Sequence, residues 1–146
     1  MSISFMIQTT SVGQLGILST GGPGNYFELL YSCSGNLYFC TRGSESDYDS
    51  ACVGKVLSDG LWHTVLIAYD GITLTLYEDG LFQFSTTTTI NTIGNSYNIL
   101  GKAAVDWGSF VGSLKNVMFY DYAVTISYVL ANSYQTAGGI LYNSGN

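Results

Sequence analysis

Apolar and polar side chains alternate in short segments along the whole chain. In residues 2–9 an apolar side chain returns at every second position from Ile3 to Ile7, which is the period of a β-strand with one buried face. Segments of similar length, rich in β-branched and aromatic residues, follow it. Ten further strands are predicted, at residues 15–19, 26–32, 37–42, 53–57, 62–69, 72–77, 81–87, 97–100, 108–112 and 114–120.

Turn residues separate these segments at regular intervals. Three Asp-Gly steps, at 59–60, 70–71 and 79–80, stand about ten residues apart, and Asp-Gly is a strong signal for a tight hairpin. The chain of 146 residues also has 18 glycines and one proline. This rhythm predicts an all-β fold, an antiparallel β-sandwich, and a single domain over residues 1–146.

Two segments depart from the strand pattern. Residues 41–50 contain Glu45, Asp47 and Asp49 among serines and a glycine, and we expect a solvated loop there. Residues 125–133 carry apolar side chains at helical spacing behind Thr125, which can cap a helix. One short helical turn near the C-terminus is therefore the most helix that the sequence predicts.

Composition narrows the possible partners. The net charge is −6 and only four residues are basic, so the chain lacks the surface that neutralises nucleic-acid phosphates. No apolar run reaches the roughly 18 residues of a membrane-spanning helix, and the first residues do not resemble a signal peptide. Only 10% of the residues are charged. Such surfaces are common in secreted binding modules and in subunits that assemble, because burying them requires little ion desolvation.

Three blocks of sequence resemble one known family. Residues 25–39 contain Asn-Tyr-Phe-Glu-Leu-Leu before a Ser-Gly-Asn turn, and residues 59–80 begin with Asp-Gly-Leu-Trp-His-Thr-Val and end in Tyr-Glu-Asp-Gly. Residues 110–121 read Phe-Val-Gly-Ser-Leu-Lys-Asn-Val-Met-Phe-Tyr-Asp. The blocks are similar to the laminin-G-like branch of the concanavalin-A-like lectin sandwiches. The resemblance implies a jelly roll of two curved sheets. It also implies a protein that is extracellular or displayed on a surface and that binds glycans or proteins at its rim. Family members generally have one more strand before the segment that begins here at Ser2.

The resemblance also implies a calcium site at the rim. Family members that bind Ca²⁺ often have Asp just before the strand that begins here at Tyr26, and this chain has Asn25 there. Asp106 and the backbone carbonyl of Gly43 are the other implied ligands, since Ca²⁺ prefers carboxylate, amide and carbonyl oxygens. Asn25 brings no charge and Arg42 would repel the ion, so a rim without metal is the alternative.

Aromatic residues suggest how a sugar is bound. The chain has 12 Tyr and 2 Trp, and their π faces can stack on sugar rings, although most are expected in the core. Trp107 stands beside Asp106 in a predicted loop rather than in a strand; a tryptophan folded over the core is the alternative. Trp107, Asp106, Asn25 and Tyr26 are the predicted ligand-binding residues.

No arrangement of residues predicts catalysis. His63 is the single histidine and no Gly-x-Ser-x-Gly motif accompanies it, so a structural role in its strand is expected. The stretch from Glu45 to Asp49 is similar to the acidic strand of sandwich glucanases, but Ser50 stands at the last acidic position. A retaining glycosidase does not work without its second carboxyl group. We therefore expect no enzymatic activity.

Cysteine placement predicts one disulfide. Cys33 lies at the tip of a predicted hairpin, too far from Cys40 for a bond. Cys40 and Cys52 flank the acidic segment symmetrically, and we expect the two flanking strands to bring them together. An oxidising environment follows from this pairing. Cys33 then remains as a free or intermolecular thiol.

The leading hypothesis is a non-catalytic module that recognises carbohydrate or glycosylated protein through loops 20–25, 43–50 and 102–109, assisted by Ca²⁺ if that site forms. The alternative is a self-assembling structural subunit of an extracellular filament, coat or adhesive layer. The apolar residues 139–142 are predicted to add a strand beside residues 2–9, in the same chain or in a neighbouring one.

Overall fold

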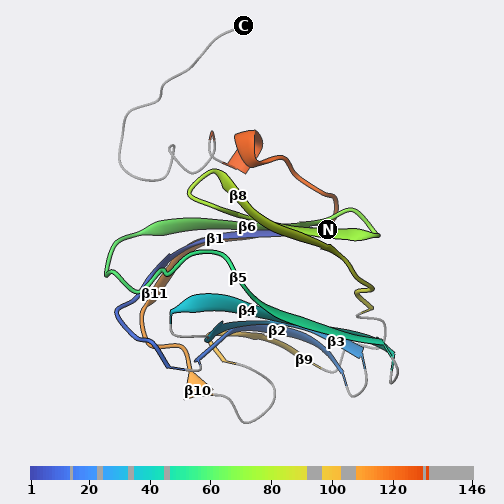
Figure 1. Cartoon of the computed structure of the whole chain (residues 1–146), viewed down its shortest axis with the longest axis horizontal. Helices are drawn as coiled ribbons and strands as arrows, with labels where there is room; N and C mark the ends of the chain where they lie inside the picture. The colour runs from blue at the N-terminus through green and yellow to red at the C-terminus, as the bar shows by residue number, and fades with distance from the viewer. Residues whose placement is uncertain are drawn as a thin grey trace, which may run out of the picture.

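Two layers of β-strands make up the part of the chain that the computed structural model describes. These residues are 1–13, 15–22, 25–32, 35–44, 47–91, 97–102, 108–129 and 131. Figure 1 shows the layers stacked on each other, with a short helix outside one of them. No helix among the described residues is long and apolar enough to cross a membrane. The predicted β-sandwich is confirmed.

The first layer is a five-stranded antiparallel sheet. Its strands, in spatial order, are β11 (Ser113–Tyr120), β1 (Ser2–Gln8), β6 (His63–Tyr69), β7 (Thr73–Glu78) and β8 (Leu81–Thr87). β1 pairs with β11 on one side and with β6 on the other. Strands far apart in the sequence are therefore neighbours in this sheet.

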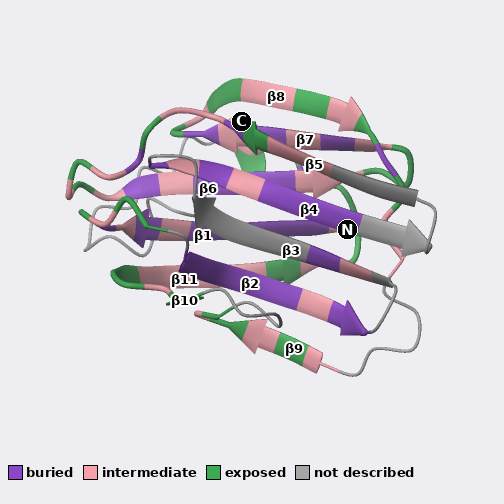
Figure 2. Ribbon diagram, turned by 60° about the horizontal axis from the view of Figure 1, so that its bottom comes forward, coloured by how far each residue is buried: buried purple, intermediate pink, exposed green. Residues whose placement is uncertain are grey.

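The second layer contains six strands. They are β10 (Gly108–Ser109), β2 (Leu15–Gly22), β3 (Asn25–Ser32), β4 (Asn36–Ser44) and β5 (Asp47–Val53) in spatial order, with β9 (Tyr97–Leu100) also paired with β2. β10 runs parallel to β2 over two residues and the other pairs are antiparallel. Figure 2 shows β9 and β11 on one side of the sandwich and β5 and β8 on the other.

The inner faces of the two sheets form the main core. Ile3, Phe5 and Ile7 of β1 are buried against Phe27 and Phe39 of the second sheet. The period-two pattern predicted for residues 2–9 thus has its apolar side facing the core. Burying each such side chain contributes about 1.5–3 kcal/mol.

The Asp-Gly step at 79–80 forms the expected tight hairpin between β7 and β8. Asp79 has a φ of 49° and Gly80 a φ of 81°, and positive φ at both central residues is characteristic of a type I′ turn. At the second step, Oδ1 of Asp70 accepts hydrogen bonds from the backbone N–H groups of Ile72 and Thr73 at 2.9 and 2.8 Å. These side-chain contacts explain why Asp-Gly steps occur at the turns between strands of this sheet.

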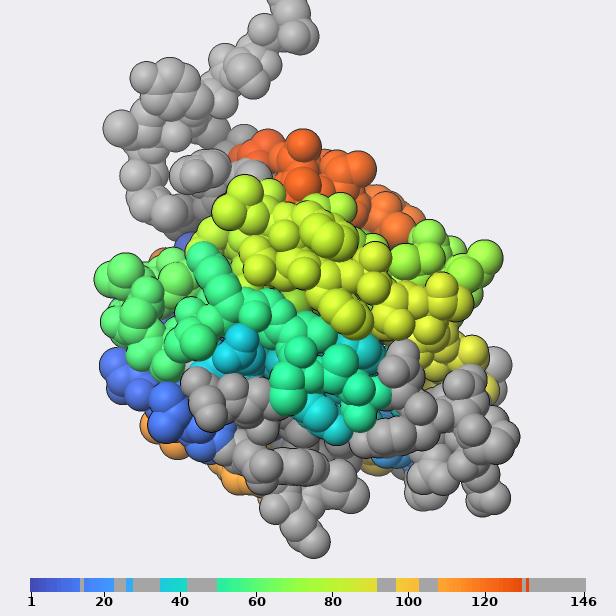
Figure 3. Space-filling model, in the orientation of Figure 1, coloured from blue at the N-terminus to red at the C-terminus, as the bar shows by residue number. Residues whose placement is uncertain are grey.

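The helical turn predicted near the C-terminus is present at residues 126–129. Its expected cap is confirmed, since Oγ1 of Thr125 accepts a hydrogen bond from the backbone N–H of Tyr128 at 3.4 Å. Val129 and Val124 pack on Leu66 of β6. The turn lies on the outer side of the five-stranded sheet, shown in orange-red in Figures 1 and 3.

Two predicted elements were wrong. The expected solvated loop at 41–50 is instead the end of β4 and the start of β5, with Thr41 opposite Asp49 in the ladder. Cross-strand pairing overrides the low β propensity of Asp and Ser there. The strand expected at 53–57 is also absent, because β5 ends at Val53 and Gly54 has a φ of 79°.

The predicted edge beside residues 2–9 does not exist. β1 is an inner strand with a partner on each side, so no strand can be added next to it. The sequence could not show that β11 occupies the position. Residues 139–142 lie outside the described part of the chain.

Candidate functional site

The outer face of the six-stranded sheet carries a set of tyrosines. Phe27 and Phe39 point into the core, and successive side chains in a strand point to opposite faces. Tyr26 of β3 and Tyr38 of β4 therefore lie on the outer face, where both are half-buried. Tyr97 of β9 is half-buried as well.

Gly21 stands between two of these tyrosines. In the ladders of β2, Gly21 is opposite Tyr26 on one side and opposite Tyr97 on the other. Residues that are opposite one another share a face of the sheet. Because neighbouring strands are about 4.8 Å apart, the backbones of Tyr26 and Tyr97 are separated by roughly 10 Å, with no side chain between them. Gly21 therefore places no side chain between the two tyrosines, and we call Tyr26, Gly21 and Tyr97 together the tyrosine slot.

Cys40 forms part of the same face. Its sulfur lies 3.8 Å from the hydroxyl of Tyr26, and the residue is 5% exposed. Ser50 of β5 is opposite Cys40 in the ladder and is half-buried. A thiol and a hydroxyl group therefore adjoin the Tyr26 side of the slot.

The predicted disulfide between Cys40 and Cys52 is wrong. Cys40 is a thiol, and its opposite residue is Ser50, whereas Cys52 is opposite Tyr38 and is exposed. The prediction assumed a loop between the cysteines, so that equal distances along the two strands would place them opposite each other. β4 and β5 are longer than expected and their register offsets the two residues. Cys33 lies outside the described residues.

The structure brings together two of the three residues predicted to hold calcium. Asn25 begins β3 opposite Gly22, and Tyr26 is opposite Arg42, so the backbones of Asn25 and Gly43 meet at one end of the sheet. Oxygen atoms at this end are the type of ligand that a hard cation such as Ca²⁺ prefers. Within the described residues, no three His, Cys, Asp or Glu side chains gather as a metal-binding group.

Asp106 and Trp107 lie outside the described part of the chain. Gly108, the next described residue, is opposite Leu15 at the start of β2, while Asn25 is opposite Gly22 at its end. The convergence of Asn25 with Asp106 stays a prediction. Of the predicted ligand-binding residues, Tyr26 is the one whose side chain the structure places.

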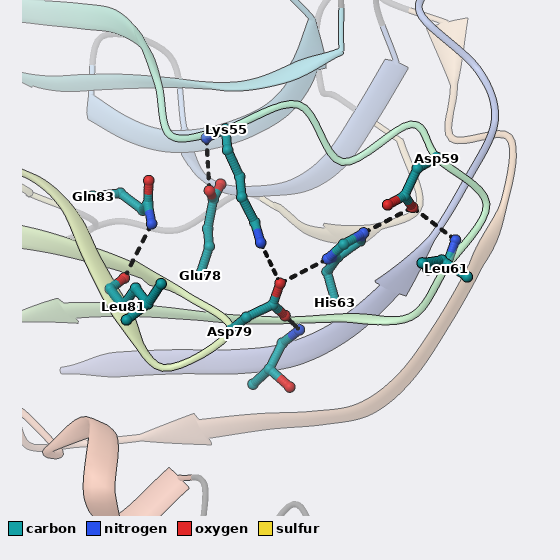
Figure 4. A network of polar contacts seen from close by, with 9 residues as sticks. Lys55, Asp59, Leu61, His63, Glu78, Asp79, Leu81 and Gln83 are labelled. Carbon is teal, nitrogen blue, oxygen red and sulfur yellow. Dashed lines mark hydrogen bonds and ion pairs between the residues drawn. The ribbon is translucent and has the colours of Figure 1, made fainter.

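A network of ionisable side chains lies at the turn after β7, shown in Figure 4. Nδ1 of His63 is 2.8 Å from Oδ2 of Asp79, and Nε2 of His63 is 2.9 Å from Oδ1 of Asp59. Asp79 also forms an ion pair with Lys55 and accepts a 2.9 Å hydrogen bond from the backbone N–H of Thr64. The network joins the segment that crosses between the sheets, residues 54–62, to the five-stranded sheet.

Both nitrogens of the His63 ring face carboxylates, which favours the doubly protonated ring. Burial lowers the pKa of His63, but the hydrogen bonds with Asp79 and Asp59 outweigh it and raise the pKa above its usual value. The hydrogen bond from His63 lowers the pKa of Asp59. Burial raises the pKa of Asp79, and the bonds from Lys55 and His63 reverse that effect and lower it.

The same geometry gives His63 a structural role. A general base needs a ring nitrogen that can accept a proton from a nucleophile, and each nitrogen here is directed at a carboxylate. His63 is also only 7% exposed. This agrees with the structural role predicted from its position in a strand.

Glu78 is a buried member of this region that the sequence did not reveal. Its carboxylate is fully buried, and burial raises its pKa. Oε2 accepts a 2.7 Å hydrogen bond from the backbone N–H of Lys55, while Oε1 has no hydrogen-bond partner. A Cβ atom at Gly54 would lie 2.2 Å from Oε1. Glycine at 54 is therefore what allows the crossing segment to pass over this carboxylate.

Sequence and structure comparisons place the chain among known proteins. A laminin-G-type family model, described as the concanavalin A-like lectin/glucanases superfamily, matches residues 1–129. The chain belongs to this superfamily. A comparison with the sequences of curated proteins finds no match.

Several solved structures have a similar fold at low sequence identity. Domains LG4-5 of the mouse laminin alpha1 chain superpose with a TM-score of 0.68 at 18% identity, covering 86% of this chain and 36% of that one. The binding domain of botulinum neurotoxin DC, in complex with rat synaptotagmin II, superposes with a TM-score of 0.70 at 15% identity, covering 92% of this chain and 36% of that one. The Ruminococcus gnavus IT-sialidase CBM40, bound to alpha2,3 sialyllactose, superposes with a TM-score of 0.67 at 16% identity, covering 90% of this chain and 80% of that one.

The chain spans about a third of the laminin fragment that it resembles. At these identities the similarity is one of fold. The tyrosine slot was not found from the sequence because Gly21, Tyr26 and Tyr97 come from three separated segments. Tyrosines at strand ends were the available signal, and they do not reveal the register that joins them.

Proposed function

We propose that this protein is a carbohydrate-binding module that holds a sugar ring at the slot formed by Tyr26, Gly21 and Tyr97. The observation that carries the proposal is the position of Gly21 opposite both tyrosines. A residue with a side chain at 21 would fill the space between the two rings. Glycine leaves the backbone as the floor of the slot.

The chemistry of the slot suits a sugar. The C–H faces of a pyranose pack against aromatic rings, and the hydroxyl groups at its edge need polar partners. Tyrosine hydroxyls and the nearby Ser50 supply such partners. The low charge of the whole chain also suits an uncharged polyol, which gains little from ion pairs.

The structural neighbours support the same class of ligand. The sialidase CBM40 is bound to sialyllactose and the binding domain of neurotoxin DC is in complex with a synaptotagmin. Cell entry of botulinum neurotoxin type C, a further structural neighbour, depends on interaction with two ganglioside molecules. Carbohydrate or glycosylated protein is therefore the proposed partner, at an extracellular or surface location. No catalytic step is included in the proposal, because the ionisable network around His63 is built as a structural bridge.

Calcium assistance is part of the proposal at one end of the sheet. The ion would be held by Asn25, the carbonyl of Gly43 and Asp106, and it would supply a positive centre for sugar hydroxyls. Asn25 and Tyr26 are consecutive, so this position adjoins the slot. Trp107 would add an aromatic contact from the segment beside Asp106.

A glycan array tests the binding function. The wild-type chain should bind a defined set of glycans, and both Tyr26→Ala and Tyr97→Ala should weaken that binding by about tenfold, equivalent to the loss of roughly 1.4 kcal/mol of stacking. Tyr122→Ala is the matched control, because Tyr122 is 54% exposed and follows β11 on the other sheet. Repeating the array with a chelator tests the calcium contribution separately.

Equal binding by the wild type and both slot variants contradicts the assignment of the slot. An array without bound glycan contradicts the whole function. Loss of binding in Tyr122→Ala as well points to a general loss of structure.

The second candidate function is a self-assembling structural subunit, and the edge strand β8 favours it. β8 pairs with β7 alone among the described strands. Its residues Leu81–Thr87 include no charged residue, and Leu81 and Phe82 are 65% and 60% exposed. Uncharged apolar edges of this kind readily pair with another chain. Phe82→Lys should then lower a mass measured by light scattering, and an unchanged mass contradicts this candidate.

A further inference from the structure

An apolar pocket opens at the side of the sandwich where β9 and β11 lie, the two strands that Figure 2 shows on the same side. It has a volume of about 410 Å³ and is lined by Leu18, Asn98, Ile99, Leu100 and Phe119. Leu18 belongs to β2 and Phe119 to β11, so the walls come from both sheets. Sites for small molecules have volumes of about 300–1,000 Å³, and this pocket lies within that range.

Two walls of the pocket expose apolar surface that a β-sandwich normally buries. Leu100 is opposite the buried Leu18 in the ladder of β9 and β2. Phe119 is opposite the buried Ile3 in the ladder of β11 and β1. Leu100 and Phe119 therefore share the inward faces of their sheets, yet they are 53% and 61% exposed. Exposed apolar side chains that gather around a hollow mark a site for an apolar group.

The walls supply almost no polar partners. Among the described residues that line the pocket, Asn98 has the only polar side chain and none is charged. Oδ1 of Asn98 already accepts a hydrogen bond from the hydroxyl of Thr20. A polar ligand would lose hydrogen bonds with water here without replacing them, whereas a hydrocarbon chain has no polar groups to satisfy. The chemistry of the pocket therefore favours an alkyl chain.

The pocket is continuous with the tyrosine slot along β9. Tyr97 and Ile99 are two residues apart in this strand and so point to the same, outer face. Ile99 also lines the pocket, so the slot and the pocket adjoin at the edge of β9. From Tyr97 to Leu100 the strand rises about 10 Å, and an eight-carbon chain with C–C bonds of about 1.5 Å extends to roughly 9 Å. One molecule can therefore reach both.

We propose that the pocket binds the alkyl chain of an amphiphilic glycoside whose sugar ring lies in the tyrosine slot. The inference rests on the proposed function and names its ligand class, a glycoconjugate with a hydrocarbon aglycone. The chain crosses the edge of β9 beside Ile99 and packs between Leu100 and Phe119. Each methylene that it buries strengthens binding about fourfold.

Calorimetric titration of the full chain with n-hexyl and n-octyl β-D-glucopyranoside, each below its micelle concentration, tests the pocket. The two probes share a head group and differ by two methylenes, so the octyl compound should bind about fifteenfold more tightly. The amide NMR signals of β9 and of Phe119 should shift along the same titration. Equal dissociation constants, or no saturable binding of octyl glucoside, overturn the proposal.

The variant Leu100→Asp tests the apolar wall itself. It should reduce the affinity ratio of octyl to hexyl glucoside from about fifteen to about one, because the chain then meets a charge. Ile72→Asp is the matched control, since Ile72 is 67% exposed and lies in the turn between β6 and β7. The control should keep the ratio of the wild type. An unchanged ratio in Leu100→Asp overturns the proposal, and the comparison of the two glucosides on the wild type needs no variant to fold.

The slot variant Tyr26→Ala separates this inference from the proposed function. It should weaken the binding of both glucosides by the same factor and leave their ratio unchanged, because it removes a contact with the sugar alone. A ratio near one, with binding that still depends on Tyr26, overturns the pocket and keeps the sugar slot. Equal affinity of wild type and Tyr26→Ala for octyl glucoside overturns the shared ligand, because the chain then binds without a sugar in the slot.

Discussion

Nδ1 of His63 lies 2.8 Å from Oδ2 of Asp79, so the first residue of β6 is tied to the turn that follows β7. Asp59 faces the other nitrogen of the same ring. One imidazole therefore bridges two carboxylates and links the segment that crosses between the sheets to a hairpin. The stability of the protein should depend on pH through this bridge.

The first prediction concerns that dependence. The pKa of His63 is raised, so its stabilising contribution is complete below its unfolded value of 6.5 and is lost as the pH rises through the folded-state pKa. The pKa values of Asp59 and Asp79 are lowered, so their contribution is complete above 3.8 and is lost as the pH falls through the folded-state pKa values. Thermal unfolding of the wild type should show the bridge intact between about pH 4 and pH 6.5.

His63→Gln is the variant that isolates the bridge. Above pH 6.5 the melting temperature of the wild type should approach that of the variant, because the charged ring is lost. A constant difference between the two proteins from pH 5 to pH 10 contradicts a stabilising imidazolium.

A second prediction concerns Glu78. Burial raises its pKa. The ionisation of Glu78 therefore lowers the stability of the wild type as the pH rises from 4.5 through the folded-state pKa. Gln at this position still accepts a hydrogen bond from the N–H of Lys55 and carries no charge. Glu78→Gln should therefore gain melting temperature relative to the wild type between pH 4 and pH 8. A difference that stays the same over this range would show that Glu78 does not titrate as a buried acid.

A third prediction compares two glycines with positive φ. Gly54→Ala places a Cβ 2.2 Å from Oε1 of Glu78, whereas at Gly71 nothing lies within 4 Å of a Cβ. Gly71→Ala should lower the free energy of unfolding by about 1 kcal/mol through backbone strain alone. Gly54→Ala should lower it by about 3 kcal/mol, because overpacking adds to that strain. Chemical denaturation measures both, and equal losses contradict the close approach to Glu78.

The fourth prediction tests the cap of the C-terminal turn. Thr125→Ala removes the hydroxyl that accepts a hydrogen bond from Tyr128, and the loss of such a cap reduces stability by about 1 kcal/mol. Thr125→Ser keeps the hydroxyl and serves as the control. Equal stability of Thr125→Ala and Thr125→Ser, measured by denaturation, argues that the turn needs no side-chain cap.

The local pattern of the sequence determined most of the strands and several turns. Apolar positions two residues apart, as in Ile3, Phe5 and Ile7, require that one face of an extended segment be buried, whatever lies across from it. The Asp-Gly step at 79–80 likewise favours a hairpin through its own backbone preferences. These are properties of consecutive residues, and the alternation at residues 2–9 and the turn at 79–80 were predicted correctly for that reason.

Only the tertiary structure decided which segments are neighbours. Asp49 became part of a strand because β4 lies beside it, against its own low propensity. The register of those same strands offsets Cys40 from Cys52. β1 is paired along one side with β11, which is distant in the sequence. The tyrosine slot exists because β3 and β9 flank Gly21. Pairing energy depends on contacts between distant residues, and a one-residue shift of register moves every side chain to the other face.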